Sequence, residues 1–262
     1  MSIFWGKNNY DICRLNQITK LKKSYTSIGP AAIILAAVLF YTGCARMSAG
    51  MPGAGDARAA GIMSELDRAN QTLVSFSGVG RLTVKRKGQI QLRERVAWVG
   101  SAPDRLSVVV FISGFPSVRF ATDGKWLYLL EPRDNKPVFR QVRASVAALA
   151  QIIGIEISFE DIVALLRGRL PLAEYRTATL TPGLAGTGDE LTLKKWWGTH
   201  QKIILAANDN VPISIRQYDR SGAERYRAVF EETVVVGGYK GPRHLRILAG
   251  DRGEFSLLTD RY

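Results

Sequence analysis

Cysteine and histidine are scarce in this 262-residue chain, and their scarcity excludes several kinds of site. The chain has two cysteines, Cys13 and Cys44, and two histidines, His200 and His244. We expect Cys13 to lie in a removed segment, which leaves Cys44 with no disulfide partner and too few thiolates for a zinc site. The two histidines lack metal-ligand spacing. The sequence therefore predicts neither a metal site nor a cofactor.

Motifs of common catalytic sites are also missing. There is no Gly-x-Ser-x-Gly elbow, no His-Glu-x-x-His helix and no phosphate-binding loop. Glu156, Glu160 and Asp161 gather around an expected helix start, where carboxylates favour the helix dipole. A catalytic carboxylate pair stays open, but nothing singles one out. We expect a protein that is not an enzyme.

Positive charge is abundant but dispersed. The formal net charge is +13, with lysines and arginines standing singly along the chain. A nucleic-acid-binding protein would show a clustered basic stripe or a readable module, and neither is present. Attraction to anionic lipid headgroups fits this charge at least as well.

The N-terminal segment has the order of a secretory signal. Lys20, Lys22 and Lys23 form a positive region, and the apolar run 31–41 follows. A membrane span needs about 20 apolar residues, so this run is too short and is typical of a signal peptide. Thr42-Gly43 directly before Cys44 resembles the lipobox of bacterial lipoproteins. An ordinary apolar segment before a cysteine, or an uncleaved N-terminal anchor, stays open as an alternative.

The lipobox resemblance implies that residues 1–43 are removed as a signal peptide and that Cys44 is lipidated. Tyr41 departs from the usual Leu, and the positive region is long. Ala45, where Asp would retain a lipoprotein in the inner membrane, implies anchoring at the periplasmic face of the outer membrane. Residues 44–56 are rich in Gly, Ala and Ser, as in a flexible tether.

Residues 57–262 are expected to form one domain, with no linker that would divide it. An apolar face predicts a first helix over 57–73, and Ser145 and Ser158 as capping residues predict helices over 146–153 and 159–167. Short segments bounded by Gly, Pro, Asp or Asn predict antiparallel strands, most of them by alternating apolar residues and 106–112 by a continuous apolar run. The expected strands are 80–84, 92–98, 106–112, 118–120, 126–130, 190–195, 200–206, 213–218, 224–235, 243–248 and 254–259.

This order predicts a mainly β fold of the α+β class. One strongly curved antiparallel sheet of about 11 strands would form a half-barrel, with about three helices covering its concave face. Such a fold has room for an apolar cavity between sheet and helices. A fully packed core with no cavity is the alternative.

Three segments together resemble the LolB-like outer-membrane lipoproteins of the LolA/LolB lipoprotein-localisation fold. They are Phe76–Leu82 (FSGVGRL), the Trp98 strand followed by 106–111, and Ile162–Pro171 (IVALLRGRLP). The resemblance implies a non-enzymatic receptor whose cavity takes the acyl chains of lipoproteins or lipids, with a periplasmic LolA-like carrier as a partner. We expect a monomer. The alternative is a structural or assembly lipoprotein that uses the fold as a protein-binding platform.

The resemblance also implies a protruding loop, here 113–117, with Phe115 touching the membrane. A Phe115 folded back onto the core is the alternative. Of Trp196 and Trp197, one is expected at the rim or surface. The inward-facing residues expected to contact a ligand, most of them core residues whatever the function, are Leu82, Val84, Val96, Trp98, Val108, Val110, Tyr226, Phe230, Leu245, Ile247 and Phe255.

Overall fold

The computed structural model describes residues 54–133, 136–183, 188–207, 209–250 and 252–262. The expected signal peptide, Cys44 and most of the expected tether lie outside these residues and stay predictions. Met51–Tyr262 is one compact unit. Among the described residues, no helix has the length and apolar character needed to cross a membrane.

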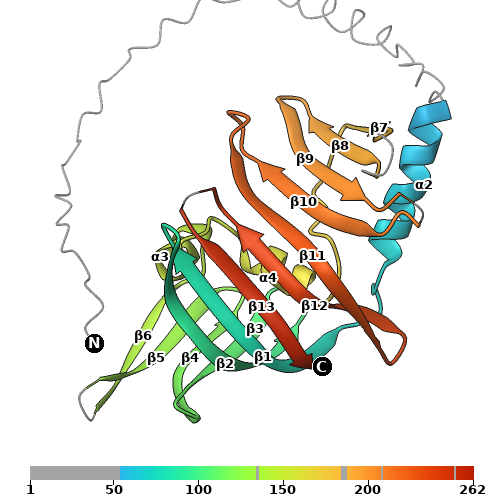
Figure 1. Cartoon of the computed structure of the whole chain (residues 1–262). Helices are drawn as coiled ribbons and strands as arrows, with labels where there is room; N and C mark the ends of the chain where they lie inside the picture. The colour runs from blue at the N-terminus through green and yellow to red at the C-terminus, as the bar shows by residue number, and fades with distance from the viewer. Residues whose placement is uncertain (1–53, 134–135, 184–187, 208, 251) are drawn as a thin grey trace, which may run out of the picture. The chain divides into compact units, whose positions relative to one another are not determined.

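The domain is built on a single antiparallel sheet of thirteen strands (Figure 1). Its order is β6-β5-β4-β3-β2-β1-β13-β12-β11-β10-β9-β8-β7, so the two halves of the chain meet where β1 pairs with β13. The strands are β1 Ser75–Arg86, β2 Gln89–Ser101, β3 Arg105–Ile112, β4 Phe115–Asp123, β5 Trp126–Arg133, β6 Lys136–Arg143, β7 Thr177–Thr181, β8 Glu190–Lys195, β9 Gly198–Leu205, β10 Pro212–Tyr218, β11 Glu224–Val236, β12 Tyr239–Leu248 and β13 Glu254–Arg261.

Short turns join neighbouring strands. Lys87 and Gly88 both have positive φ, as the two central residues of a tight hairpin turn require, and they connect β1 to β2. A second turn follows Asp123, whose carboxylate accepts the amides of Lys125 and Trp126. These hydrogen bonds lower the pKa of Asp123.

Three helices accompany the sheet in the described part of the chain: α2 Ala54–Arg68, α3 Val146–Ile153 and α4 Phe159–Leu166. Ser145 and Ser158 cap α3 and α4, each accepting a backbone amide with its hydroxyl, as predicted. Gly154 ends α3 in the left-handed conformation. At Gly168, just after α4, φ is positive and a Cβ would overlap the carbonyl oxygen of Lys240, so glycine is required there.

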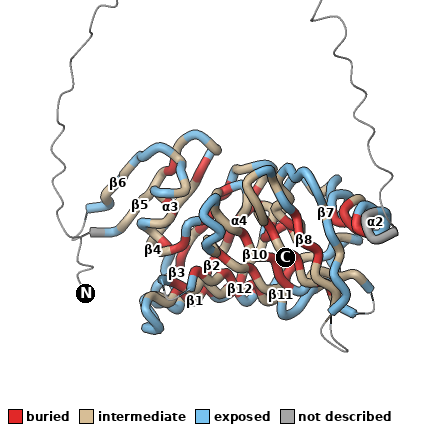
Figure 2. Tube along the Cα trace, turned by 90° about the horizontal axis from the view of Figure 1, so that it is seen from above, coloured by how far each residue is buried: buried red, intermediate tan, exposed pale blue. Residues whose placement is uncertain are grey.

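The sheet curves around α4. This helix contacts both β3 and β12, which are four positions apart in the strand order. Four strand spacings amount to about 19 Å in a flat sheet, whereas an eight-residue helix is about 12 Å long and about 10 Å wide. The sheet must therefore bend for both strands to reach the helix. Figure 2 shows the buried positions gathered along the strands around α4.

The predicted fold class is confirmed: a mainly β domain with one curved antiparallel sheet and three helices. Two edge strands were not predicted. β6 (KPVFRQVR) and β7 (TATLT) carry few large apolar residues because each has a neighbour on one side only.

The first helix differs from its expected range of 57–73 at both ends. It begins at Ala54, inside the expected tether, and ends at Arg68, since Asn70 takes a positive φ. Ala59, Ile62, Met63 and Leu66 form its buried face against the β7 end of the sheet, and Ala69 is exposed.

Candidate functional site

All eleven residues expected to contact a ligand lie on one face of six adjacent strands, in the order β3-β2-β1-β13-β12-β11. We call this set the apolar layer. Cross-strand pairing joins its members: Val108 with Trp98, Val84 with Phe255, and Phe255 with Ile247. Nine are buried, and Phe230 and Phe255 are partly buried against them. Whether they contact a ligand stays a prediction.

The FSGVGRL motif has a physical role at the start of this layer. Gly78 lies opposite Trp98, and a Cβ on Gly78 would overlap the indole ring. The glycine thus leaves space for the largest side chain of the layer. Trp98 is only 4% exposed and meets Tyr262 edge to face, with ring centroids 6.1 Å apart. Its indole N–H has no hydrogen-bond partner among the described residues.

We call helices α3 and α4 the cover: α4 contacts β3 and β12, and α3 is bound to the end of β1 through Arg86. Five of the eight residues of α4 are buried: Phe159, Ile162, Val163, Leu165 and Leu166. Ile155 and Ile157, in the short connection between the helices, are fully buried. The cover is thus held mainly by apolar contacts, which are non-directional.

Arg86 adds a polar attachment for the cover. This residue ends β1, and its guanidinium donates to the carbonyl oxygens of Gln151 and Ile152 at 2.9 and 2.8 Å. Both carbonyls belong to the last turn of α3, where a cation also interacts favourably with the helix dipole. Nothing in the sequence predicted this contact.

A pocket of about 490 Å³ lies beside α4, and we call it the α4 pocket. None of the eleven residues of the apolar layer lines it. Tyr226 connects the two, because its buried ring belongs to the layer and its hydroxyl donates to Asp161, a pocket residue, at 2.8 Å. Burial raises the pKa of Asp161, and burial together with the nearby carboxylate raises the pKa of Tyr226 well above its usual value.

The Leu-Pro end of the IVALLRGRLP motif forms one wall of the α4 pocket. Two buried glutamines from adjacent strands, Gln201 and Gln217, donate to the carbonyl oxygen of Pro171 at 2.6 and 3.3 Å. They attach the segment after α4 to the sheet. The side-chain oxygens of both glutamines lack a hydrogen-bond partner within the described ranges.

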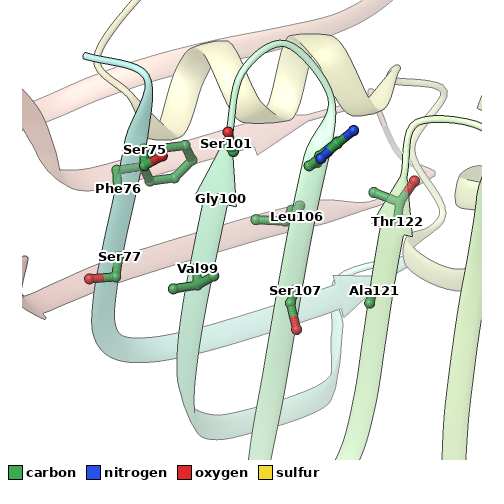
Figure 3. Close-up of a pocket in the computed structure, with 11 residues that line it drawn as sticks. Ser75, Phe76, Ser77, Val99, Gly100, Ser101, Leu106, Ser107, Ala121 and Thr122 are labelled. Carbon is green, nitrogen blue, oxygen red and sulfur yellow. The ribbon is translucent and has the colours of Figure 1, made fainter.

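A second pocket, of about 440 Å³, lies over β1 to β4 (Figure 3). Two neighbouring cross-strand rows line it: Phe76, Gly100, Leu106 and Thr122 form one, and Ser77, Val99, Ser107 and Ala121 form the other. By strand alternation the side chains of the two rows point to opposite faces of the sheet. Arg105 is the one titratable residue in its lining. None of the apolar layer lines this pocket either.

The two histidines have different surroundings. His200 lines the α4 pocket and meets Trp197 edge to face, and burial, then Lys195, lowers its pKa. His244 bonds to Ser256 at 3.0 Å through Nε2 and to Glu231 at 2.6 Å through Nδ1.

Ser256, His244 and Glu231 are linked in the order of a catalytic triad, but the surroundings of Ser256 differ from those of a catalytic serine. Ser256 is in β13, between β1 and β12, so the backbone amides of this strand serve the sheet on both sides. No oxyanion hole can form from them. Arg246, opposite Ser256, is bound to Glu231 and Glu254. The structure therefore favours an ion-pair network over a catalytic site.

The remaining expected positions are at the surface. Phe115 begins β4, at the tip of the β3–β4 hairpin, and is 74% exposed, so it is not folded back onto the core. Ile112, paired with it, is 40% exposed. Trp196 is 78% exposed and Trp197 is partly buried, as expected for a pair in which one ring lies at the surface. No group of three or more metal-ligating side chains occurs among the residues that the structure describes.

No protein-family model matches the sequence, and no curated protein sequence matches it either. Solved structures do match. A domain from Vibrio parahaemolyticus named as an outer membrane lipoprotein-sorting protein aligns with a TM-score of 0.50 at 13% identity, covering 78% of this chain and 91% of that one.

Two further structures align at the same identity of 13% and a TM-score of 0.46. A LolA superfamily protein from Nitrosomonas europaea covers 77% of this chain and 91% of its own. A DUF1329 family protein from Desulfovibrio piger covers 79% and 92%. The fold match to the Vibrio domain agrees with the resemblance in the sequence: the chain has the LolA-like fold.

Proposed function

We propose that this protein binds acyl chains of lipoproteins or lipids between its sheet and helices α3 and α4, and accepts them for insertion into the outer membrane without catalysing a reaction. The apolar layer is the observation that carries this proposal. It runs without interruption across six strands and is covered by two short helices instead of a second sheet. Binding acyl chains by burying their apolar surface needs no reactive residue.

The energetics of exchange support the proposal. Burying five side chains of α4 contributes roughly 7–15 kcal/mol, at about 1.5–3 kcal/mol each. A chain of about 15 methylenes contributes about 12 kcal/mol when buried. Because the two amounts are similar, an acyl chain can replace the contacts of the helix at small net cost.

The exposed hairpin supports delivery to a membrane. Phe115 and Ile112 pair with each other across the hairpin and together present an exposed apolar tip. Aromatic side chains of this kind insert into the interface of a bilayer. A lipid on Cys44 would hold the domain at that surface, and a LolA-like carrier would supply the ligand.

Brominated fatty acids test the acyl-binding step, because bromine quenches tryptophan fluorescence only at short range. Trp98 lies within the apolar layer, whereas Trp196 is exposed. We expect 9,10-dibromostearate to quench the wild-type protein saturably and to quench Trp98→Phe much less. Equal quenching of both proteins, or no saturable quenching, would refute the proposal.

The assembly-platform alternative has one specific observation in its favour. Val99 and Phe139 are 57% and 62% exposed, and Phe139 stacks on Tyr128 at 6.2 Å. Exposed apolar groups of this kind mark protein contacts. This alternative predicts no fatty-acid binding and a co-purifying envelope protein that is lost in Phe139→Glu.

A further inference from the structure

Arg167 is a buried cation without a counter-charge. It is 6% exposed, and no described carboxylate forms an ion pair with it. Among the described residues, its side chain makes one hydrogen bond, a long one of 3.4 Å to the carbonyl oxygen of Asn70, and its Nε has no partner. Burial, followed by repulsion from Arg169, lowers its pKa. Buried charges in proteins are ordinarily paired, so this arrangement points to an anionic ligand that would pair with Arg167.

The residue is held in place by its backbone. Asn70 donates from its side chain to the carbonyl oxygens of Arg167 and Lys240, both at 2.6 Å. The amide of Arg167 caps the last turn of α4. These bonds fix the end of α4 against β12, while the guanidinium contributes little to them.

Arg167 lines the α4 pocket, whose other charges do not neutralise it. The pocket holds three carboxylates. Asp67 is paired with Arg169 at 3.1 Å, and Asp161 accepts the hydroxyl of Tyr226. Glu160 is exposed and lies two helical turns away, about 10 Å along the axis.

We propose that the α4 pocket binds the phosphate or carboxylate of a lipid headgroup, with Arg167 as its principal contact and Arg225 as a second cation in the lining. This inference rests on the proposed function and narrows its ligand to amphiphiles with an anionic head. Tyr226 places the pocket next to the apolar layer, so head and chain can be bound together. A guanidinium is suited to phosphate and carboxylate because its donors match their geometry.

The test compares two amphiphiles with the same chain, dodecyl phosphate and dodecanol, and adds inorganic phosphate. Each is titrated at low mole fraction into the full chain in dodecyl maltoside, and binding is followed by calorimetry. The variants are wild type, Arg167→Met and, as a matched control, Arg119→Met, which removes an exposed arginine that lines neither pocket.

We expect dodecyl phosphate to bind wild type and Arg119→Met about tenfold or more tightly than it binds Arg167→Met, with dodecanol unaffected by either substitution. Equal binding of dodecyl phosphate to all three proteins would overturn the anion site. Inorganic phosphate binding as tightly as dodecyl phosphate, and lost in Arg167→Met, would assign the site to free phosphate and overturn the lipid headgroup. Failure of both amphiphiles to bind would instead contradict the proposed function.

Thermal unfolding gives a second, independent readout. Since Arg167 is a buried unpaired charge, we expect Arg167→Met to unfold at a higher temperature than wild type without ligand. A merely structural arginine would give a lower unfolding temperature in Arg167→Met, which would overturn the proposal even if binding could not be measured.

Discussion

Leu165→Ala tests whether α4 is the removable cover of the apolar layer. Leu165 is fully buried on α4, so its truncation removes contacts from the face that meets the sheet. Truncations of this kind cost about 2–5 kcal/mol. A loss of about 3 kcal/mol lowers the unfolding temperature of a domain of this size by about 6–12 °C. If that loss falls on the packing of α4, displacement of the helix becomes about 100-fold more frequent.

The matched control is Leu191→Ala. Leu191 is also fully buried but lies on β8, outside the apolar layer. Stopped-flow quenching of Trp98 by 9,10-dibromostearate measures the association rate. We expect a rise of about tenfold or more in Leu165→Ala and a change below about twofold in Leu191→Ala, at similar loss of stability. Equal rate changes in the two variants would refute the role of α4 as the cover.

Three further predictions concern the attachment, the membrane contact and the pocket. Arg86→Met removes two hydrogen bonds to α3, so we expect amide exchange in α3 to accelerate by about tenfold, whereas the exposed Arg81→Met leaves it unchanged. Phe115→Glu should weaken association with phospholipid vesicles and impair delivery, and a vesicle affinity equal to that of Phe139→Glu would contradict the membrane contact. Asp161 has a raised pKa when folded, so the native state binds more protons and stability is lost as pH rises from the unfolded pKa through the folded one. Asp161→Asn should remove that loss of stability, measured by urea unfolding from pH 4 to 7. If the free energy of unfolding depends on pH equally in wild type and Asp161→Asn, burial of the Asp161 carboxylate does not destabilise the fold.

Local patterns in the sequence determined much of the fold. Serines at 145 and 158 predicted the starts of α3 and α4 correctly because a capping hydroxyl acts within one helical turn. Alternation predicted the interior strands because successive side chains of a strand point to opposite faces, so a buried face places apolar residues at every second position. β7 was missed because its alternation depends on Ala178 and Leu180 alone, so the five-residue strand has a single large apolar side chain.

The polar parts of the site could not be predicted in the same way. Arg167 follows Leu165 and Leu166 at the end of α4, where an arginine is ordinarily exposed. Only the fold shows that it is buried and that no described carboxylate pairs with it. Gln201 and Gln217 are sixteen residues apart in sequence and meet at Pro171 through strand pairing. Such contacts depend on register across strands, which a single sequence does not specify.

Mass spectrometry of the protein purified from membranes in a gentle detergent reads both the N-terminus and any bound lipid. We expect a chain that begins at Cys44 with added acyl mass and retains about one equivalent of an acylated lipid or lipoprotein. An acylated chain with nothing bound, in wild type as in Leu165→Ala, would contradict acyl binding and favour the assembly platform.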